Sequence, residues 1–211
     1  GRSVGGTDLN GDGFKDLIVG APGLTGAGEG TRATVAGSMY VFYGSAKVLS
    51  PQADFKFTGA TIGGHLGEGL GALGDVNHDG YSDVAIGERD FACGGQIAGK
   101  IYMFLGGPKG LSKDRMWSVV GKGGSGLGRT FAAAGDLNGD GFADFLTGAP
   151  TGPGDQGAGA YVFLGAAKSW GPPVVIAAEG PATGLGAGIF PAGDVNHDGV
   201  PDVVVGGPAG G

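Results

Sequence analysis

The sequence predicts an all-β fold of many short strands, and three observations support this. Glycine accounts for 52 of the 211 residues, without the period of three that marks collagen. A glycine inside a helix costs about 1 kcal/mol relative to alanine, so this density disfavours helices. Apolar residues make up 41% of the chain, which is enough to fill a core. Short apolar runs bounded by glycine and proline recur along the chain, and such runs are typical of strands.

A nine-residue segment rich in aspartate occurs four times. It reads DLNGDGFKD at 8–16, DVNHDGYSD at 75–83, DLNGDGFAD at 136–144 and DVNHDGVPD at 194–202. The last three copies follow similar glycine-broken apolar pieces: LGEGLGALG, LGRTFAAAG and LGAGIFPAG. Each copy leads into an apolar run, and two further strand-like runs follow the first three copies. Spacings of 67, 61 and 58 residues suit a repeating unit of about four strands.

Each unit is therefore expected to run strand, loop, strand, strand, strand. One such sheet cannot bury both of its faces, and radial stacking of several sheets into a β-propeller solves that problem. We expect a single propeller unit over 1–211, with blades at approximately 1–60, 61–121 and 122–181 and a half-blade at 182–211. The opening strand of the first blade is expected to be short or missing.

About three and a half blades do not make a closed ring, because closed propellers usually have four to eight. An open ring would leave unpaired strand edges, which favour aggregation. We therefore expect either that this chain is a fragment of a longer one, or that a homodimer completes a ring of about seven blades.

The four repeated segments are candidate metal sites. In a tight turn the side chains at positions 1, 3 and 5 converge, and glycine at position 6 permits a positive φ angle. The carbonyl of position 7 and the carboxylate of position 9 complete a cage of oxygen donors. Ca²⁺ prefers such a set, whereas Mg²⁺ demands a smaller and nearly octahedral site.

We expect about four Ca²⁺ ions per chain, one in each loop. The expected ligands are Asp8, Asn10, Asp12, Phe14 and Asp16; Asp75, Asn77, Asp79, Tyr81 and Asp83; Asp136, Asn138, Asp140, Phe142 and Asp144; and Asp194, Asn196, Asp198, Val200 and Asp202.

Two other interpretations of these loops were weighed. An EF-hand needs a bidentate glutamate at position 12, but that position holds Val19, Ile86, Thr147 and Val205. A single copy could also be an Asx-rich turn that binds no metal. Four copies with the same ligand pattern favour the metal site.

Charge and motif content exclude several classes of function. The net charge is −7, twelve of the aspartates lie in the four loops, and no basic run is present. We therefore expect no nucleic-acid partner. No apolar run is long enough for a membrane span. Cys93 is the sole cysteine, so no internal disulfide can form.

Catalytic residues are not expected, and we expect no enzyme. The three histidines are scattered, and no G-x-S-x-G nucleophile elbow is present. Glu68, Glu88 and Glu179 could in principle pair with an aspartate for glycoside cleavage, but the sequence offers nothing that brings such a pair together.

The loops and their flanks resemble the FG-GAP repeat of the integrin α-subunit N-terminal propeller, and we expect a bacterial relative. GAP follows the loop at 20–22 and 148–150, and GGP stands at 206–208. The FG half is replaced by Leu-Gly at 66–67, 127–128 and 185–186, and the second unit has GER at 87–89. The resemblance implies a seven-bladed propeller whose calcium loops join the first and second strands of its blades, on the face away from the ligand surface.

Two functions remain after these exclusions. The first is a calcium-stabilised adhesion module that binds a protein or a glycan without catalysis. We expect it outside the cell, at the cell surface, or secreted or periplasmic in a bacterium, because open calcium loops of this kind need millimolar Ca²⁺. The second is an accessory propeller domain of a larger secreted hydrolase or lyase.

Overall fold

The computed structural model describes residues 1–23, 36–47, 49–150, 159–168, 170–177 and 184–208. Within this part of the chain the regular structure is β-strand, apart from one 3₁₀ turn, η1 (Lys113–Arg115). The expected all-β fold is confirmed. No helix in these residues is both long and apolar enough to cross a membrane.

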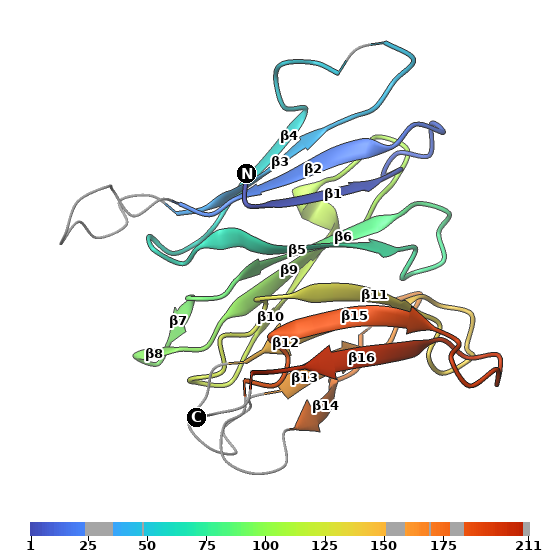
Figure 1. The fold of residues 1–211 in the computed structure, drawn as a ribbon. Helices are drawn as coiled ribbons and strands as arrows, with labels where there is room; N and C mark the ends of the chain where they lie inside the picture. The colour runs from blue at the N-terminus through green and yellow to red at the C-terminus, as the bar shows by residue number, and fades with distance from the viewer. Residues whose placement is uncertain (24–35, 48, 151–158, 169, 178–183, 209–211) are drawn as a thin grey trace.

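The strands form antiparallel sheets that correspond to propeller blades (Figure 1). The first sheet contains β1 (Ser3–Thr7), β2 (Asp16–Ala21), β3 (Ser38–Phe42) and β4 (Phe55–Thr58). The second contains β5 (Leu66–Gly74), β6 (Asp83–Glu88), β9 (Lys100–Phe104) and β10 (Met116–Val120). The third contains β11 (Phe131–Gly135), β12 (Asp144–Ala149), β13 (Gly159–Phe163) and β14 (Val174–Ala177).

Two strands of a fourth sheet follow, namely β15 (Gly188–Gly193) and β16 (Asp202–Gly206). A small hairpin of β7 (Ala92–Cys93) and β8 (Gln96–Ile97) interrupts the connection from β6 to β9. The blades are thus three complete sheets and one half-sheet, as the sequence predicts. The exact division at 1–60, 61–121, 122–181 and 182–211, and the closure of a ring by a second chain, stay predictions.

The opening strand of the first blade is present, whereas the sequence predicted that it would be short or missing. β1 pairs with β2 over five residue pairs, from Ser3 opposite Gly20 to Thr7 opposite Asp16. Two of its five residues are glycine, which hides the strand from a search for apolar alternation.

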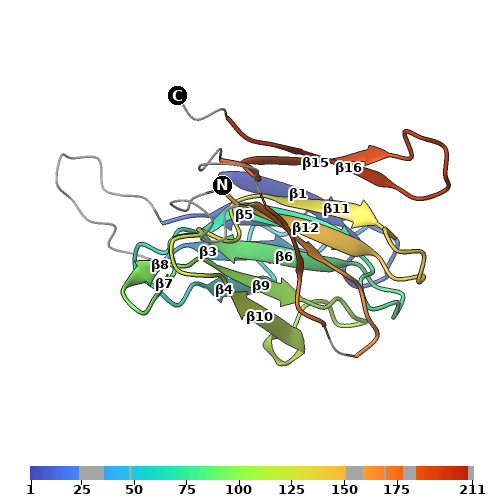
Figure 2. The same cartoon turned by 90° about the horizontal axis from the view of Figure 1, so that it is seen from below.

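The sheets stack face to face around the four first strands (Figures 1 and 2). β1, β5, β11 and β15 contact one another in that order. Three apolar clusters fill the spaces between successive sheets. Phe104 and Ile18 are fully buried between the first two sheets, and Phe145 and Phe163 stack at a centroid distance of 4.9 Å between the second and third.

Glycines of the two repeated motifs, GAP and Leu-Gly, meet between neighbouring blades. A Cβ atom added at Gly87 would lie 1.8 Å from the carbonyl oxygen of Gly128, far inside any permitted contact. The same approach recurs between Gly20 and Gly67 and between Gly148 and Gly186. The glycine of GAP or GER in one blade therefore packs against the Leu-Gly glycine of the next, which explains why the two motifs occur together.

Candidate metal centres

The four aspartate-rich loops occupy the same place in every sheet. They join β1 to β2, β5 to β6, β11 to β12 and β15 to β16, and Figure 1 shows all four at the same end of the stacked sheets. The sequence predicted this placement between the first and second strands. The β7–β8 hairpin lies at the opposite end.

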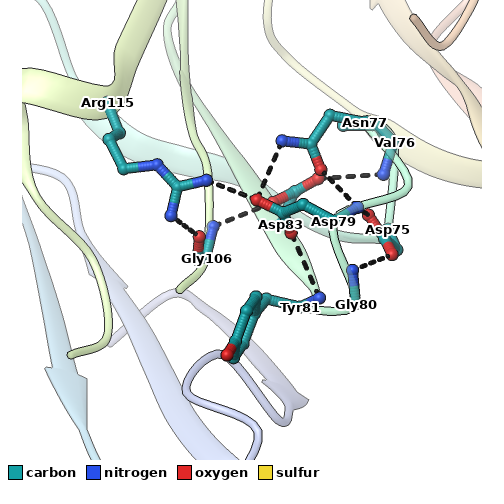
Figure 3. A network of polar contacts seen from close by, with 9 residues as sticks. All are labelled: Asp75, Val76, Asn77, Asp79, Gly80, Tyr81, Asp83, Gly106 and Arg115. Atoms are coloured by element: carbon teal, nitrogen blue, oxygen red, sulfur yellow. Dashed lines mark hydrogen bonds and ion pairs between the residues drawn. The ribbon is translucent and has the colours of Figure 1, made fainter. Parts of the chain in front are cut away.

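The loops share one hydrogen-bond network, which Figure 3 shows for the second loop. Asp75, at position 1, accepts hydrogen bonds from the backbone N–H groups of Asp79 and Gly80, at 3.0 and 2.7 Å. The side chain of Asn77 accepts from the Asp79 N–H and donates to the Asp79 carboxylate. Asp79 in turn accepts from the N–H of Tyr81. Equivalent bonds occur in the other three loops.

Position 4 adopts a left-handed conformation that the sequence interpretation overlooked. Its φ angles are 74° and 73° where it is Gly11 or Gly139, and 57° and 61° where it is His78 or His197. The two histidines are exposed, and His78 Nδ1 lies 2.8 Å from the carbonyl oxygen of Gly141 in the third loop. Both histidines therefore belong to the shape of their loops, and His78 also contacts the next loop.

The aspartate at position 9 is turned into the sheet. One oxygen of the buried Asp83 accepts from the N–H of Val76, at 2.9 Å, and the other from the N–H of Gly106, at 2.8 Å. Asp16 and Asp144 accept two backbone hydrogen bonds in the same way. Burial raises the pKa of Asp83 to about 7 and also raises the pKa of Asp16 and Asp144, while the backbone N–H donors lower it.

This orientation separates the carboxylates of each loop into two groups. Position 9 holds the third strand of the blade to the loop, whereas the position-5 carboxylates are exposed to solvent. Accordingly, among the described residues, no three acidic, histidine or cysteine side chains are grouped closely enough to hold a metal ion between them. The convergence of all five donors in each loop stays a prediction.

The donor chemistry nevertheless fits a hard cation. Positions 1, 3 and 5 offer carboxylate and amide oxygens on an already folded loop, and each oxygen has lone pairs beyond those used by backbone N–H groups. Backbone hydrogen bonds lower the pKa of Asp136 and of Asp198, so these carboxylates are readily charged. A Cβ atom at position 6 would meet no neighbour, so glycine is required there by φ angles between 87° and 91°.

Position 2 ties each of the first two loops to the next blade. The carbonyl oxygen of the buried Leu9 accepts from the N–H of Gly107 at 2.9 Å, and that of the buried Val76 accepts from Ala166 at 3.0 Å. Val195, at position 2 of the last loop, is 67% exposed. The loops are therefore part of the packing between blades.

A cation already contacts the second loop. The guanidinium of Arg115 donates to the carboxylate of Asp79 and to the carbonyl oxygen of Gly106 (Figure 3). Arg115 lies 36 residues beyond Asp79, so loop spacing alone could not reveal the contact.

The glutamates considered for catalysis have other partners. Glu88 is fully buried and accepts from the N–H groups of Ala60 and Thr61 and from the hydroxyl of Tyr102. Glu68 pairs with Arg89 at 2.8 Å and with Arg2 at 3.1 Å. Glu179 lies outside the described residues.

A charged cluster therefore forms around GER, where the first and third units have GAP and the fourth has GGP. Arg89 lies beside Asp90, whose carboxylate is 2.6 Å from Nδ1 of His65. The cluster stands at the beginning of β5, at the end of the sheet opposite the metal loop. Cys93, in the nearby hairpin, is an exposed free thiol.

The fold and the repeated loops define a propeller assembled from copies of one strand–loop–strand unit. The family model described as FG-GAP repeat matches residues 1–42, 69–104 and 127–163, together more than half of the chain. The protein belongs to the FG-GAP repeat family.

Similar proteins include several integrin α chains. Mouse integrin alpha-IIb is 34% identical over 155 residues, and Xenopus laevis integrin alpha-5 is 32% identical over 155 residues. Drosophila melanogaster integrin alpha-PS3 is 36% identical over 157 residues. Each match covers 71% of this chain but only 13–14% of the relative, so the chain spans about a seventh of their length.

Proposed function

We propose that this protein is a calcium-stabilised, non-enzymatic adhesion module that binds a protein or a glycan. The observation that carries the proposal is the fourfold recurrence of one oxygen-rich loop, folded alike and placed alike between the first two strands of each sheet. Membership of the FG-GAP family and similarity to integrin α chains support an adhesion role.

In this proposal the ions bind at positions 1, 3, 5, 7 and 9 of the loops. A bound Ca²⁺ offsets two of the three negative charges of its loop and links the end of the first strand to the start of the second. The chain itself positions the donors through the shared hydrogen-bond network. In the first three blades, position 9 also anchors the loop to the second residue after the third strand, such as Gly106.

The ligand surface is proposed to lie at the end of the blades opposite the loops. In the second blade the cluster of His65, Glu68, Arg89 and Asp90 lies at that end, with side chains suited to polar recognition. Because loops of this type bind calcium at the millimolar concentrations found outside cells, we propose an extracellular, cell-surface or periplasmic location.

The alternative function is that of an accessory propeller in a larger secreted hydrolase or lyase. It shares the calcium loops and the family, so it differs only in what the propeller is attached to. Hydrolase or lyase activity of the full gene product on a polysaccharide, lost when its other domains are removed, would favour this alternative.

Calcium-dependent unfolding tests the metal part of the proposal. We expect Ca²⁺ to raise the melting temperature measured by calorimetry, and the chelator EGTA to lower it, with Mg²⁺ much less effective. Native mass spectrometry should count about four Ca²⁺ ions per chain. An unchanged melting temperature in EGTA would contradict the metal role.

Binding and ring closure need separate measurements. Glycan and secreted-protein arrays probed with and without Ca²⁺ should yield a ligand whose binding is lost in EGTA. We also propose a homodimer that completes the ring, and light scattering that finds only monomers would exclude it.

A further inference from the structure

Arg115 makes the second metal loop different from the other three. It immediately precedes β10, and its guanidinium reaches across to the second loop, where it contacts the Asp79 carboxylate and the Gly106 carbonyl oxygen together (Figure 3). Gly106 also donates its N–H to Asp83, at position 9 of the same loop. The guanidinium thus connects positions 5 and 9 of one loop through a shared backbone residue.

This arrangement has no counterpart in the other loops over the part of the chain that the structure describes. Asp12, Asp140 and Asp198 form no ion pair there. The residue before the outer strand, which is Arg115 in the second blade, is Asp54 in the first and Pro173 in the third. Among the three outer strands that the structure describes, only that of the second blade is therefore preceded by a cation.

We propose that Arg115 is an internal competitor for Ca²⁺, which makes the second loop the weakest calcium site of the chain. The inference rests on the proposed calcium function. The Asp79 oxygen that the guanidinium contacts also accepts from Asn77, and the other accepts from the N–H of Tyr81. For a metal ion to use the first oxygen it must displace Arg115 or bind beside a positive charge.

The size of the effect follows from either route. Displacing a partly exposed ion pair, or holding Ca²⁺ a few ångströms from a guanidinium in water-like surroundings, weakens binding by up to about tenfold. The protein would then fill three loops at one calcium concentration and the second loop only at a higher one, giving a graded response.

The sequence supplies a control within the chain. The last loop repeats the first six residues of the second, DVNHDG, including histidine at position 4. A difference between these two loops cannot come from the identity of the residues at positions 1 to 6. Position 7 contributes only its backbone carbonyl in either loop.

Loop-by-loop NMR can test the proposal. The position-6 glycine N–H donates to the position-1 aspartate in every loop, so the amide signals of Gly13, Gly80, Gly141 and Gly199 report on their own loops. During titration of the full chain with CaCl₂ we expect the Gly80 signal to respond at up to about tenfold higher Ca²⁺ than the others. In Arg115→Gln its midpoint should fall to theirs.

Lys113→Gln is the matched control, because Lys113 belongs to the same 3₁₀ turn and its ammonium lies over the Phe57 ring instead of contacting a loop carboxylate. It removes the same charge and should leave the Gly80 midpoint unchanged. Arg115→Lys keeps the positive charge but lacks the planar guanidinium that contacts Asp79 and Gly106 together, so its Gly80 midpoint should be intermediate. This second variant keeps the proposal testable if Arg115→Gln misfolds.

The outcomes separate this inference from the proposed function. If all four glycines respond together in the wild type and Arg115→Gln changes nothing, the competitor role is wrong while the calcium function stands. If none of the glycines responds to Ca²⁺, the calcium function itself fails. An equal shift in Lys113→Gln would mean that overall charge, and not the Arg115 contact, sets the affinity.

Discussion

Glu88 allows a sharp test, because the family motif and the structure lead to opposite expectations. It is the last residue of β6, and the last residues of β2 and β12 are Ala21 and Ala149. Replacing Glu88 by alanine would restore the GAP-like residue, and a consensus argument predicts a more stable protein. The structure predicts a less stable one.

The buried carboxylate of Glu88 fastens the connection between the first two blades. It accepts from Thr61 at 2.7 Å, from Ala60 at 3.2 Å and from the Tyr102 hydroxyl at 2.7 Å. Gly64 leaves the space that this carboxylate fills, because a Cβ atom there would lie 2.3 Å from Oε1. Glu88→Ala thus leaves three donors without their acceptor, along with a cavity.

The magnitude follows from those donors. A buried donor left unpaired costs about 1–3 kcal/mol, which applies in full to the buried Tyr102 hydroxyl and only in part to the partly buried N–H groups of Ala60 and Thr61. Removing the carboxylate recovers part of its desolvation free energy, so we expect a net loss of about 3 kcal/mol, near the low end for breaking a buried charged network. For a chain of this length that lowers the melting temperature by about 6–12 °C.

Urea unfolding followed by tryptophan fluorescence measures the change in the free energy of unfolding. Tyr102→Phe removes one of the three bonds and should cost about 1 kcal/mol. Glu88→Gln keeps the shape and should fall between the two. A Glu88→Ala variant as stable as the wild type, or more stable, would refute the reasoning.

Three further predictions concern stability, all measured by urea unfolding. Thr147→Val should stabilise by about 1 kcal/mol, because the buried hydroxyl has no hydrogen-bond partner among the described residues, whereas Thr130→Val loses the bond to Gly186 and should destabilise by about as much. Gly87→Ala should cost about 3 kcal/mol or prevent folding, because its Cβ would meet backbone of the next blade, while Gly171→Ala meets nothing and should be neutral. Asp83→Asn should cost about 2 kcal/mol even in EGTA, because the amide keeps one oxygen and its NH₂ group cannot accept from the second backbone donor. An equal loss on the same aspartate-to-asparagine change at the exposed position 5 of that loop would contradict this.

Most of the blade strands and their order could be predicted from the sequence because the repeat supplies several copies of each signal, whereas the β7–β8 hairpin occurs once and was not predicted. A single glycine-rich strand such as β1 is nearly invisible alone, but the loop at 8–16 fixes where it must lie. The contact between Gly87 and Gly128 was not predictable, because pattern shows that two motifs occur together without showing that they touch.

In the loops, too, the sequence pattern did not predict the contacts of individual side chains. Spacing placed the aspartates of one loop in a common turn, yet it could not decide which way each carboxylate points. Asp83 is drawn inward by the N–H groups of Val76 and Gly106, one of which comes from a strand end 23 residues away. The Arg115 contact depends on a similarly distant segment.

These contacts divide the work within each loop. In the first two loops position 2 packs between blades, in the first three position 9 holds the end of the third strand, and neither task requires a metal ion. Positions 1, 3 and 5 keep the turn closed through backbone N–H donors while leaving charged oxygens at the surface. Backbone hydrogen bonds thus close the turn without using up the oxygens that the proposed calcium site needs. Under the proposed function, bound calcium would add stability to a turn that already has its own hydrogen bonds, unlike the ion of small domains that fold only around their metal. The Arg115 contact would then give the second loop a calcium requirement of its own.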